Sequence, residues 1–252
     1  MAAPATLKTA ARFAAPSFVM PGTVAENARF LSGRAAEVGL CLFETRACLE
    51  YGAEDLPPDL AALPLTWHVH LPVDLPWEDG GAAAASSALT VLEKVRYLAP
   101  HVAVLHPPET HGDPARRDAL LVSFAAAWRG SGISVLLENI DGCPLTDMVD
   151  VICGQDFGVC LDVGHLLGYD QNRLPKTPEL MERVRLVHWS APGVRDQHLP
   201  LTALTPEQRT AARRVAAGLP DGVTHLVEVF HWRGVEESLP VLDSVLGMSG
   251  RA

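Results

Sequence analysis

The fold of this 252-residue chain is decided by the stretch Gly158-Val-Cys-Leu-Asp162-Val-Gly-His165. Its first five residues form a short apolar run that ends in a carboxylate, and such a run is typical of a buried parallel strand. His165 then begins the following loop. Because burying an unpaired carboxylate is costly, Asp162 needs a cation or a hydrogen-bond donor as its partner.

The same pattern, an apolar run followed by a helical pattern, repeats along the chain. The expected strands are 13–19, 38–44, 66–71, 102–106, 134–138, 158–162, 184–188 and 225–230. The expected helices are 83–98, 115–129, 145–153, 179–183, 206–217 and 235–246, preceded by one that opens near Thr23 with Glu26 completing a capping box. This alternation predicts βαβ units of the α/β class. We expect a single (β/α)8 TIM barrel over residues 1–252, with a core at 12–248; a doubly wound open sheet is the alternative.

Composition and charge exclude several classes of protein. The formal net charge is −10, and no cluster of Lys and Arg is longer than a pair. Proteins that grip duplex DNA need a concentrated positive surface, so no nucleic-acid partner is expected. No apolar run approaches the ~18 residues of a membrane helix. We predict a cytoplasmic protein without a membrane partner, and five cysteines that lack a C-x-x-C motif predict reduced core thiols.

Ligand-type side chains close or follow most of the expected strands. They are His70, His106, Glu138, Asp162, His165, His188, Asp196, His198 and Glu228. The carboxyl ends of barrel strands meet at one mouth, where the active sites of such barrels lie. Any one of these residues alone is more often structural, but together they predict a multinuclear metal site and a metal-dependent hydrolase.

Other histidines receive different interpretations. His68 shares a face with His70 and is a candidate to orient it. His101, His111 and His225 are expected at the surface, and His231 is not expected to be a ligand. By the same alternation, Glu228 and Phe230 share one face.

These residues resemble the motifs of the xylose-isomerase-like barrels, specifically their endonuclease IV branch. The resemblance rests on Glu138-Asn139, Asp162-x-x-His165, His188, Asp196-x-His198 and Glu228. It implies two to three divalent ions, zinc or manganese. His70 and His106 would hold one ion and Asp162, His188 and Glu228 a second, with Glu138 bridging; His165, Asp196 and His198 would hold a third.

Segments between the ligands resemble the cobamide-remodelling phosphodiesterases. The matching blocks include His68-Val-His-Leu-Pro-Val-Asp-Leu-Pro-Trp77, Leu105-His-Pro-Pro108 and His188-Trp-Ser-Ala-Pro192. The resemblance implies hydrolysis of the nucleotide-loop phosphodiester of vitamin B12-type cobamides, with the cobamide as a small-molecule substrate. Glu138, Asp162, His165 and His198 would serve catalysis.

Substrate contacts are expected from loops at the mouth. The candidates are Glu44, Trp77, Tyr169, Trp189 and Trp232. Flat aromatic faces can stack on a benzimidazole-like base, although ordinary packing at the rim explains them equally well. For Glu44 the alternative is a salt bridge with Arg46.

Three rival functions remain open from the sequence. An abasic-site endonuclease would share the metals but conflicts with the acidic charge. A sugar isomerase or epimerase of the same superfamily would need one metal, and a corrinoid carrier would bind without turnover. Oligomeric state is not predicted.

Overall fold

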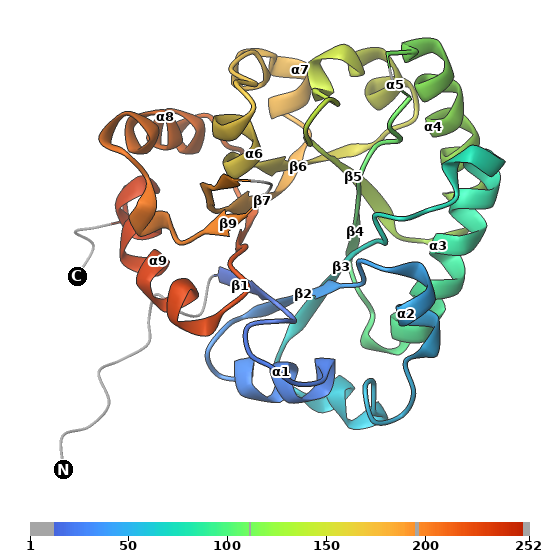
Figure 1. Ribbon diagram of the computed structural model, residues 1–252, viewed down its shortest axis with the longest axis horizontal. Helices are drawn as coiled ribbons and strands as arrows, with labels where there is room; N and C mark the ends of the chain where they lie inside the picture. Colours follow the sequence, from blue (N-terminus) through green and yellow to red (C-terminus); the bar gives the residue numbers. More distant parts are fainter. Residues whose placement is uncertain (1–12, 111, 195–196, 249–252) are drawn as a thin grey trace.

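The computed structural model describes residues 13–110, 112–194 and 197–248. Eight parallel strands close into a barrel, and helices surround it (Figure 1). In order around the barrel the strands are β1 Phe13–Pro16, β2 Glu37–Cys41, β3 Thr66–His70, β4 Val102–Leu105, β5 Ser134–Glu138, β6 Gly158–Asp162, β7 Val184–Trp189 and β10 Thr224–Val227. The predicted TIM barrel is therefore confirmed, and the open-sheet alternative is wrong.

Helices of very different lengths connect the strands. They are α1 Val24–Leu31, α2 Thr45–Glu50, α3 Gly81–Val95, α4 Pro114–Trp128, α5 Val149–Gly154, α6 Val163–Gly168, α7 Pro178–Met181, α8 Pro206–Ala217 and α9 Trp232–Val245. Short 3-10 turns supplement them: η2 Pro58–Ala62, η3 Trp77–Asp79, η4 Arg96–Leu98, η5 Arg129–Ser131, η6 Leu145–Asp147, η7 Leu174–Lys176 and η9 Leu201–Ala203. After β7 the chain forms a small antiparallel hairpin from β8 Ala191–Pro192 and β9 His198–Leu199.

Element ends show where local sequence signals were sufficient. Strands β5 and β6 and helix α8 have the predicted bounds, and Thr23 forms the predicted capping box with Glu26. Strands β1, β2 and β10 each end three residues earlier than predicted. The expected helix at 145–153 is divided into η6 and α5, because the backbone of Met148 leaves the helical region at φ −127°.

Inside the barrel, side chains form layers. A central apolar layer comprises Ala14, Val104, Leu136, Cys160, Leu186 and Leu226, all nearly inaccessible to solvent. Since side chains two positions apart on a strand point the same way, the next layer toward the carboxyl ends follows directly. Two positions after five of these residues come His106, Glu138, Asp162, His188 and Glu228. The packed layer therefore forms the floor of a polar mouth.

Two further predictions are testable on the described residues. All five cysteines are free, and four of them are buried, as expected for reduced core thiols. Across 13–110, 112–194 and 197–248, no helix combines the length and the apolar character needed to cross a membrane.

Candidate metal centre

Glu138, the last residue of β5, lies at the centre of the polar mouth. Its Oε2 is 3.1 Å from Nε2 of His70 and 3.5 Å from Nε2 of His106. Its Oε1 is 3.3 Å from Nδ1 of His188. The two oxygens of one fully buried carboxylate therefore face two separate sets of imidazoles, and Glu138 could contribute one oxygen to each set.

The hydrogen bonds of His70 show that something is needed between it and Glu138. His70 Nδ1 is 2.9 Å from the carbonyl oxygen of Leu71, which can only accept, so Nδ1 is the donor. In the neutral ring Nε2 is then an acceptor, and it faces a carboxylate oxygen. Two acceptors at this distance need a proton or a cation between them.

A second group of possible metal ligands surrounds Oε1 of Glu138. Ligand atoms of Glu138, Asp162, His188 and Glu228 lie within 4.8 Å of one another, and all four side chains are buried. His188 Nδ1 is 2.9 Å from Glu228 Oε2, yet neither atom has a partner with hydrogen-bond geometry among the described residues. Asp162 Oδ2 lacks such a partner as well.

Buried polar atoms without partners are rare, because each one costs about 1–3 kcal/mol. A concentration of them on carboxylates and imidazoles is typical of residues that bind a metal ion. Carboxylate oxygens and imidazole nitrogens together suit zinc or manganese. The residues present therefore fit divalent cations.

The pKa values of three residues in the cluster differ strongly from their usual values. Burial is the largest influence on Asp162, and it raises the pKa of this carboxyl to about 6, with Glu138 and Glu228 adding to the effect. Burial also opposes ionisation of Glu228, but the facing His188 and His198 outweigh it and lower its pKa to about 2. For His188, burial is outweighed by Cys160, Glu228 and Glu138, which raise its pKa well above the usual value. Bound cations would replace protons held by such a cluster.

Asn139 holds the ends of β5 and β6 together behind the cluster. Its Oδ1 accepts from the backbone N–H of Asp162 at 2.8 Å, and its Nδ2 donates to the Asp162 carbonyl and to Gln171 Oε1, each at 3.0 Å. Gln171 Nε2 donates in turn to the Ile140 carbonyl at 2.7 Å. Such outer contacts fix the orientation of ligands, and Gln171 is a supporting residue that sequence reasoning missed.

The predicted third set is described only in part, because Asp196 lies outside the described residues. His165 Nδ1 donates to the Asn139 carbonyl at 2.9 Å, which places the ring lone pair on Nε2. The ring of His165 lies 5.5 Å from that of His198, and His198 Nδ1 is 3.4 Å from Glu228 Oε2. The structure therefore brings His165 and His198 to the same mouth; that they bind an ion stays a prediction.

The substrate residues expected from sequence have mixed outcomes. Trp189 has no exposed surface, and its Nε1 donates to His225 Nδ1 at 3.1 Å, so its predicted substrate contact is wrong. The cause is alternation along β7, which turns Trp189 outward because His188 points inward. Trp232 packs edge-on against Phe30 at 5.2 Å, which is ordinary rim packing.

The other three expected substrate residues lie at loop positions. Trp77 packs against Phe124 and also lines a cavity that includes His106. Tyr169 contacts the ring of His165 at 5.5 Å and lines a small cavity with His165 and His198. Glu44 is exposed, and Arg46 pairs with Glu50 at 3.4 Å. The alternative of a Glu44–Arg46 salt bridge is therefore not what the structure shows.

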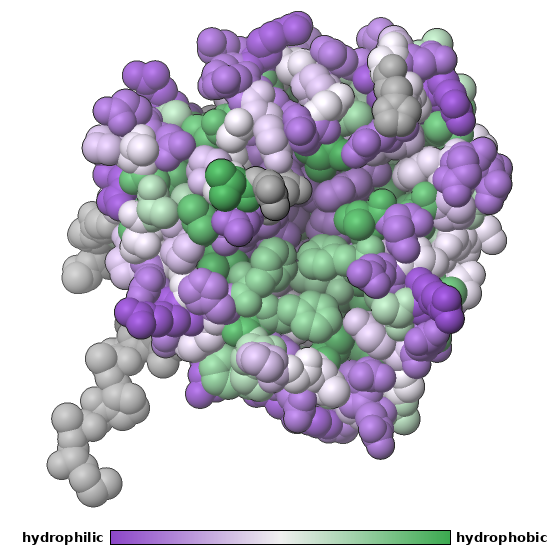
Figure 2. All heavy atoms as spheres, in the orientation of Figure 1, coloured by the Kyte–Doolittle hydropathy of each residue, from purple (hydrophilic) through white to green (hydrophobic). Residues whose placement is uncertain are grey.

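Two aromatic residues at the mouth were not predicted as functional. Phe43 contacts the ring of His70 at 5.0 Å and that of Phe230 at 5.9 Å, and Phe230 contacts His198 at 5.4 Å. Figure 2 shows a hollow with hydrophilic side chains near the centre of the molecule and a patch of hydrophobic side chains on its flank. The only sequence signal was that Phe230 shares a face with Glu228.

The opposite end of the barrel holds a second carboxylate among histidines. Glu37 Oε1 is 2.6 Å from His68 Nδ1 and 2.8 Å from His101 Nε2, while Thr66 Oγ1 donates to its Oε2 at 3.1 Å. His68 thus pairs with Glu37, and the expectation that it orients His70 is wrong. His225, which was expected at the surface, is partly exposed, and its ring accepts a hydrogen bond from Trp189.

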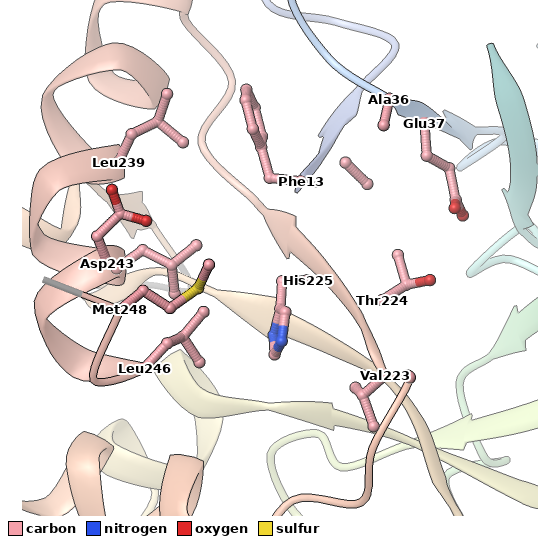
Figure 3. Close-up of a pocket in the computed structure, with 13 residues that line it drawn as sticks. Phe13, Ala36, Glu37, Val223, Thr224, His225, Leu239, Asp243, Leu246 and Met248 are labelled. Atoms are coloured by element: carbon pink, nitrogen blue, oxygen red, sulfur yellow. The ribbon is translucent and has the colours of Figure 1, made fainter. Parts of the chain in front are cut away.

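An apolar cavity of about 370 Å³ lies at that same end (Figure 3). Phe13, Glu37 and His225 line it from the barrel, and Leu239, Leu246 and Met248 line it from α9 and the turn that follows. The mouth ligands are absent from its lining. The cavity is therefore separate from the candidate metal centre.

Solved structures share this architecture at low sequence identity. A D-tagatose 3-epimerase-like protein superposes with a TM-score of 0.69 at 17% identity, covering 94% of this chain and 97% of its own. A xylose isomerase domain-containing protein from Salmonella typhimurium LT2 gives 0.64 at 15% identity, covering 94% and 97%. A family 2 AP endonuclease from Brucella melitensis gives 0.60 at 17% identity, covering 92% and 96%.

Neither a scan of family models nor a search of curated proteins finds a match. At these identities the likeness establishes the fold alone. The chain has the TIM-barrel architecture seen in xylose-isomerase-like proteins, sugar isomerase and epimerase proteins and AP endonucleases.

Proposed function

We propose that this protein is a metal-dependent phosphodiesterase that acts on the nucleotide loop of cobamides. The observation that supports hydrolysis most directly is the position of Glu138, whose two oxygens face separate donor sets. A carboxylate shared in this way is suited to two cations side by side, and paired cations clamp the attacking and leaving oxygens of phosphate esters.

A sugar isomerase or epimerase is the second candidate. The set formed by Glu138, Asp162, His188 and Glu228 is by itself enough for one metal, and a structural neighbour is described as D-tagatose 3-epimerase-like. That reading leaves His70 and His106 without a role, although both approach Glu138 from the other side. The extra set of donors favours the phosphodiesterase.

Divalent cations bound here would supply an activated water and neutralise charge on the phosphate. The residues of the chain divide the remaining tasks. Glu138 would contribute one oxygen to each of the two ligand sets. Asp162 and Glu228 would supply negative charge that stabilises bound cations. His165 and His198, side by side at the edge of the cluster, would hold a further cation, which would neutralise charge on the leaving oxygen.

The cobamide substrate is proposed from the resemblance of loops between the ligands, above all residues 68–77 and 188–192. The net charge of −10 argues against a nucleic-acid substrate. We therefore expect no shift of an abasic duplex in a gel at low salt, and a shift would favour the endonuclease alternative.

The experiment is a chromatographic assay of reduced, zinc- or manganese-loaded protein with adenosylcobalamin. The expected result is loss of the lower base and appearance of a cobinamide-type product. Glu37→Gln is a matched control, since it changes a carboxylate among histidines at the opposite end of the barrel and should leave turnover intact. Metal analysis giving two or more ions per chain would support hydrolysis, whereas one ion with no cobamide turnover would favour the isomerase.

A further inference from the structure

The two sides of the mouth differ in chemistry. Phe43, in the loop after β2, and Phe230, in the loop after β10, form a continuous aromatic wall with His70 and His198. A cavity of about 560 Å³ beside His106 is lined by the polar residues Glu78, Glu109, Thr110 and Arg116 and by apolar residues that include Val73, Leu75 and Trp77. The candidate metal ligands therefore lie between an aromatic wall and a recess whose lining is partly polar and partly apolar.

Position beside candidate ligands distinguishes Phe230 from the other exposed apolar side chains. Phe230 is 38% exposed, although a large apolar side chain would gain free energy by burying that surface. Its ring lies 5.4 Å from the ring of His198, which is a candidate ligand. Ligand sites typically combine such apolar surface with a few convergent polar groups.

We propose that Phe43 and Phe230 bind a flat, apolar group of the substrate, next to the phosphate that the metal ligands would hold. The polar part of the substrate lies toward His106 and Arg116. This proposal rests on the proposed function and narrows it to phosphate esters of planar, apolar alcohols or nucleosides. Open-chain sugars present hydroxyl groups on both sides, so they would gain little binding energy from contact with Phe43 and Phe230.

The test compares two non-hydrolysable probes by calorimetry on the metal-loaded protein. Methylphosphonate reports the metal centre alone, and (naphthalen-2-ylmethyl)phosphonate adds a flat apolar group. We expect the naphthyl probe to bind about tenfold more tightly, since each aromatic contact contributes about 0.5–1.5 kcal/mol and 1.4 kcal/mol is tenfold.

The variants locate that preference. Phe43→Ala and Phe230→Ala should each reduce the ratio of affinities, and the double variant should bring it to within about twofold. Methylphosphonate should bind all of them equally well. Tyr97→Ala is the control, because Tyr97 is similarly exposed at 39% and lines neither side of the mouth. If the double variant folds poorly, Phe230→Leu replaces it. This variant keeps an apolar side chain but lacks a flat face, so it should retain only part of the ratio of affinities.

Equal binding of both probes to the unaltered protein, or a preference that survives in the double variant, would overturn the proposal. Failure of the proposed function looks different, because phosphonates would then bind with the expected ratio while no diester is hydrolysed. Hydrolysis of adenosylcobalamin with an unchanged KM in the double variant would reject the wall and keep the phosphodiesterase.

Discussion

The two ends of the barrel each bury a carboxylate among histidines: Glu138 at the mouth, and Glu37 at the opposite end, which we call the closed end. Among the described residues, only at the mouth do buried polar atoms of side chains lack hydrogen-bond partners. At the closed end, Glu37 accepts hydrogen bonds from His68, His101 and Thr66, and none of these side chains has a buried polar atom without a partner in the described part of the chain. At the mouth, Asp162, His188, His198 and Glu228 all have such atoms.

The difference teaches that residue types alone do not identify a metal site. Both clusters hold ligand-type atoms within 4.8 Å of one another. What separates them is whether donors and acceptors satisfy each other: one carboxylate with three donors makes a closed network, whereas three carboxylates crowded with imidazoles do not. A cation is needed only where acceptors face acceptors.

The largest effect is expected at the residue shared by both donor sets. Glu138→Gln keeps the size of the side chain but removes the charge that faces His70 and His188. We expect turnover to fall by about 10²–10³-fold or more, with loss of bound metal, because charge stabilisation at such sites is worth this much. Rates and metal content of the purified variant would be measured beside Glu37→Gln, and equal activity in the two variants would remove the distinction between the ends.

A smaller effect is expected behind the ligands. Asn139→Ala removes the contacts that fix Asp162 and leaves Gln171 without one partner. Loss of such supporting contacts commonly weakens metal binding about 10–100-fold. Titration with zinc in competition with a chromogenic chelator would measure this. Unchanged affinity in a folded variant would mean that the strand ends hold Asp162 without help.

Metal binding should also distinguish the ends by stability. Free metal at 100 times its Kd stabilises a folded protein by about 2.7 kcal/mol, which is several degrees in the melting temperature. Addition of manganese or zinc after removal by a chelator should raise the melting temperature of the unaltered protein and of Glu37→Gln, but much less that of Asp162→Asn. An equal rise in all three would place the bound ion elsewhere.

Sequence reasoning located the mouth because one rule governs it. His106, Glu138, Asp162, His188 and Glu228 each stand two positions beyond a residue of the central apolar layer. Alternation along short strands is local, and it is enforced by burial of the apolar layer. The barrel and the convergence of these residues could therefore be predicted.

The same rule has limits that the misplaced residues expose. His68 and His70 share a face but lie in different layers, and periodicity does not say which end of the barrel a position serves. Phe43 lies in the loop after β2, where the alternation of a strand no longer predicts the direction of a side chain. Only its contact with the ring of His70 indicates that it belongs to the mouth. Contacts between side chains of different strands and loops depend on tertiary geometry, which alternation along one strand does not predict.

The smallest predicted effect concerns the closed end and its dependence on pH. The hydrogen bonds from His101 and His68 outweigh burial and hold the pKa of Glu37 below its usual value, while Glu37 raises the pKa of His101. For Glu37 the gain in stability is present above its unfolded pKa and is lost as the pH falls. For His101 the gain is present below its unfolded pKa of 6.5 and is lost as the pH rises through the higher folded value.

Both gains are therefore present near pH 5.5, between the unfolded values of the two groups. His101→Ala should lower the free energy of unfolding more at pH 5.5 than at pH 9, by a modest amount because the imidazole is 46% exposed. Urea unfolding at the two pH values measures the difference. The variant should keep its metal content, since His101 contacts Glu37 at the end remote from Glu138. A loss of metal in His101→Ala, or an equal loss of stability at both pH values, would show that the closed end is not the self-sufficient network described above.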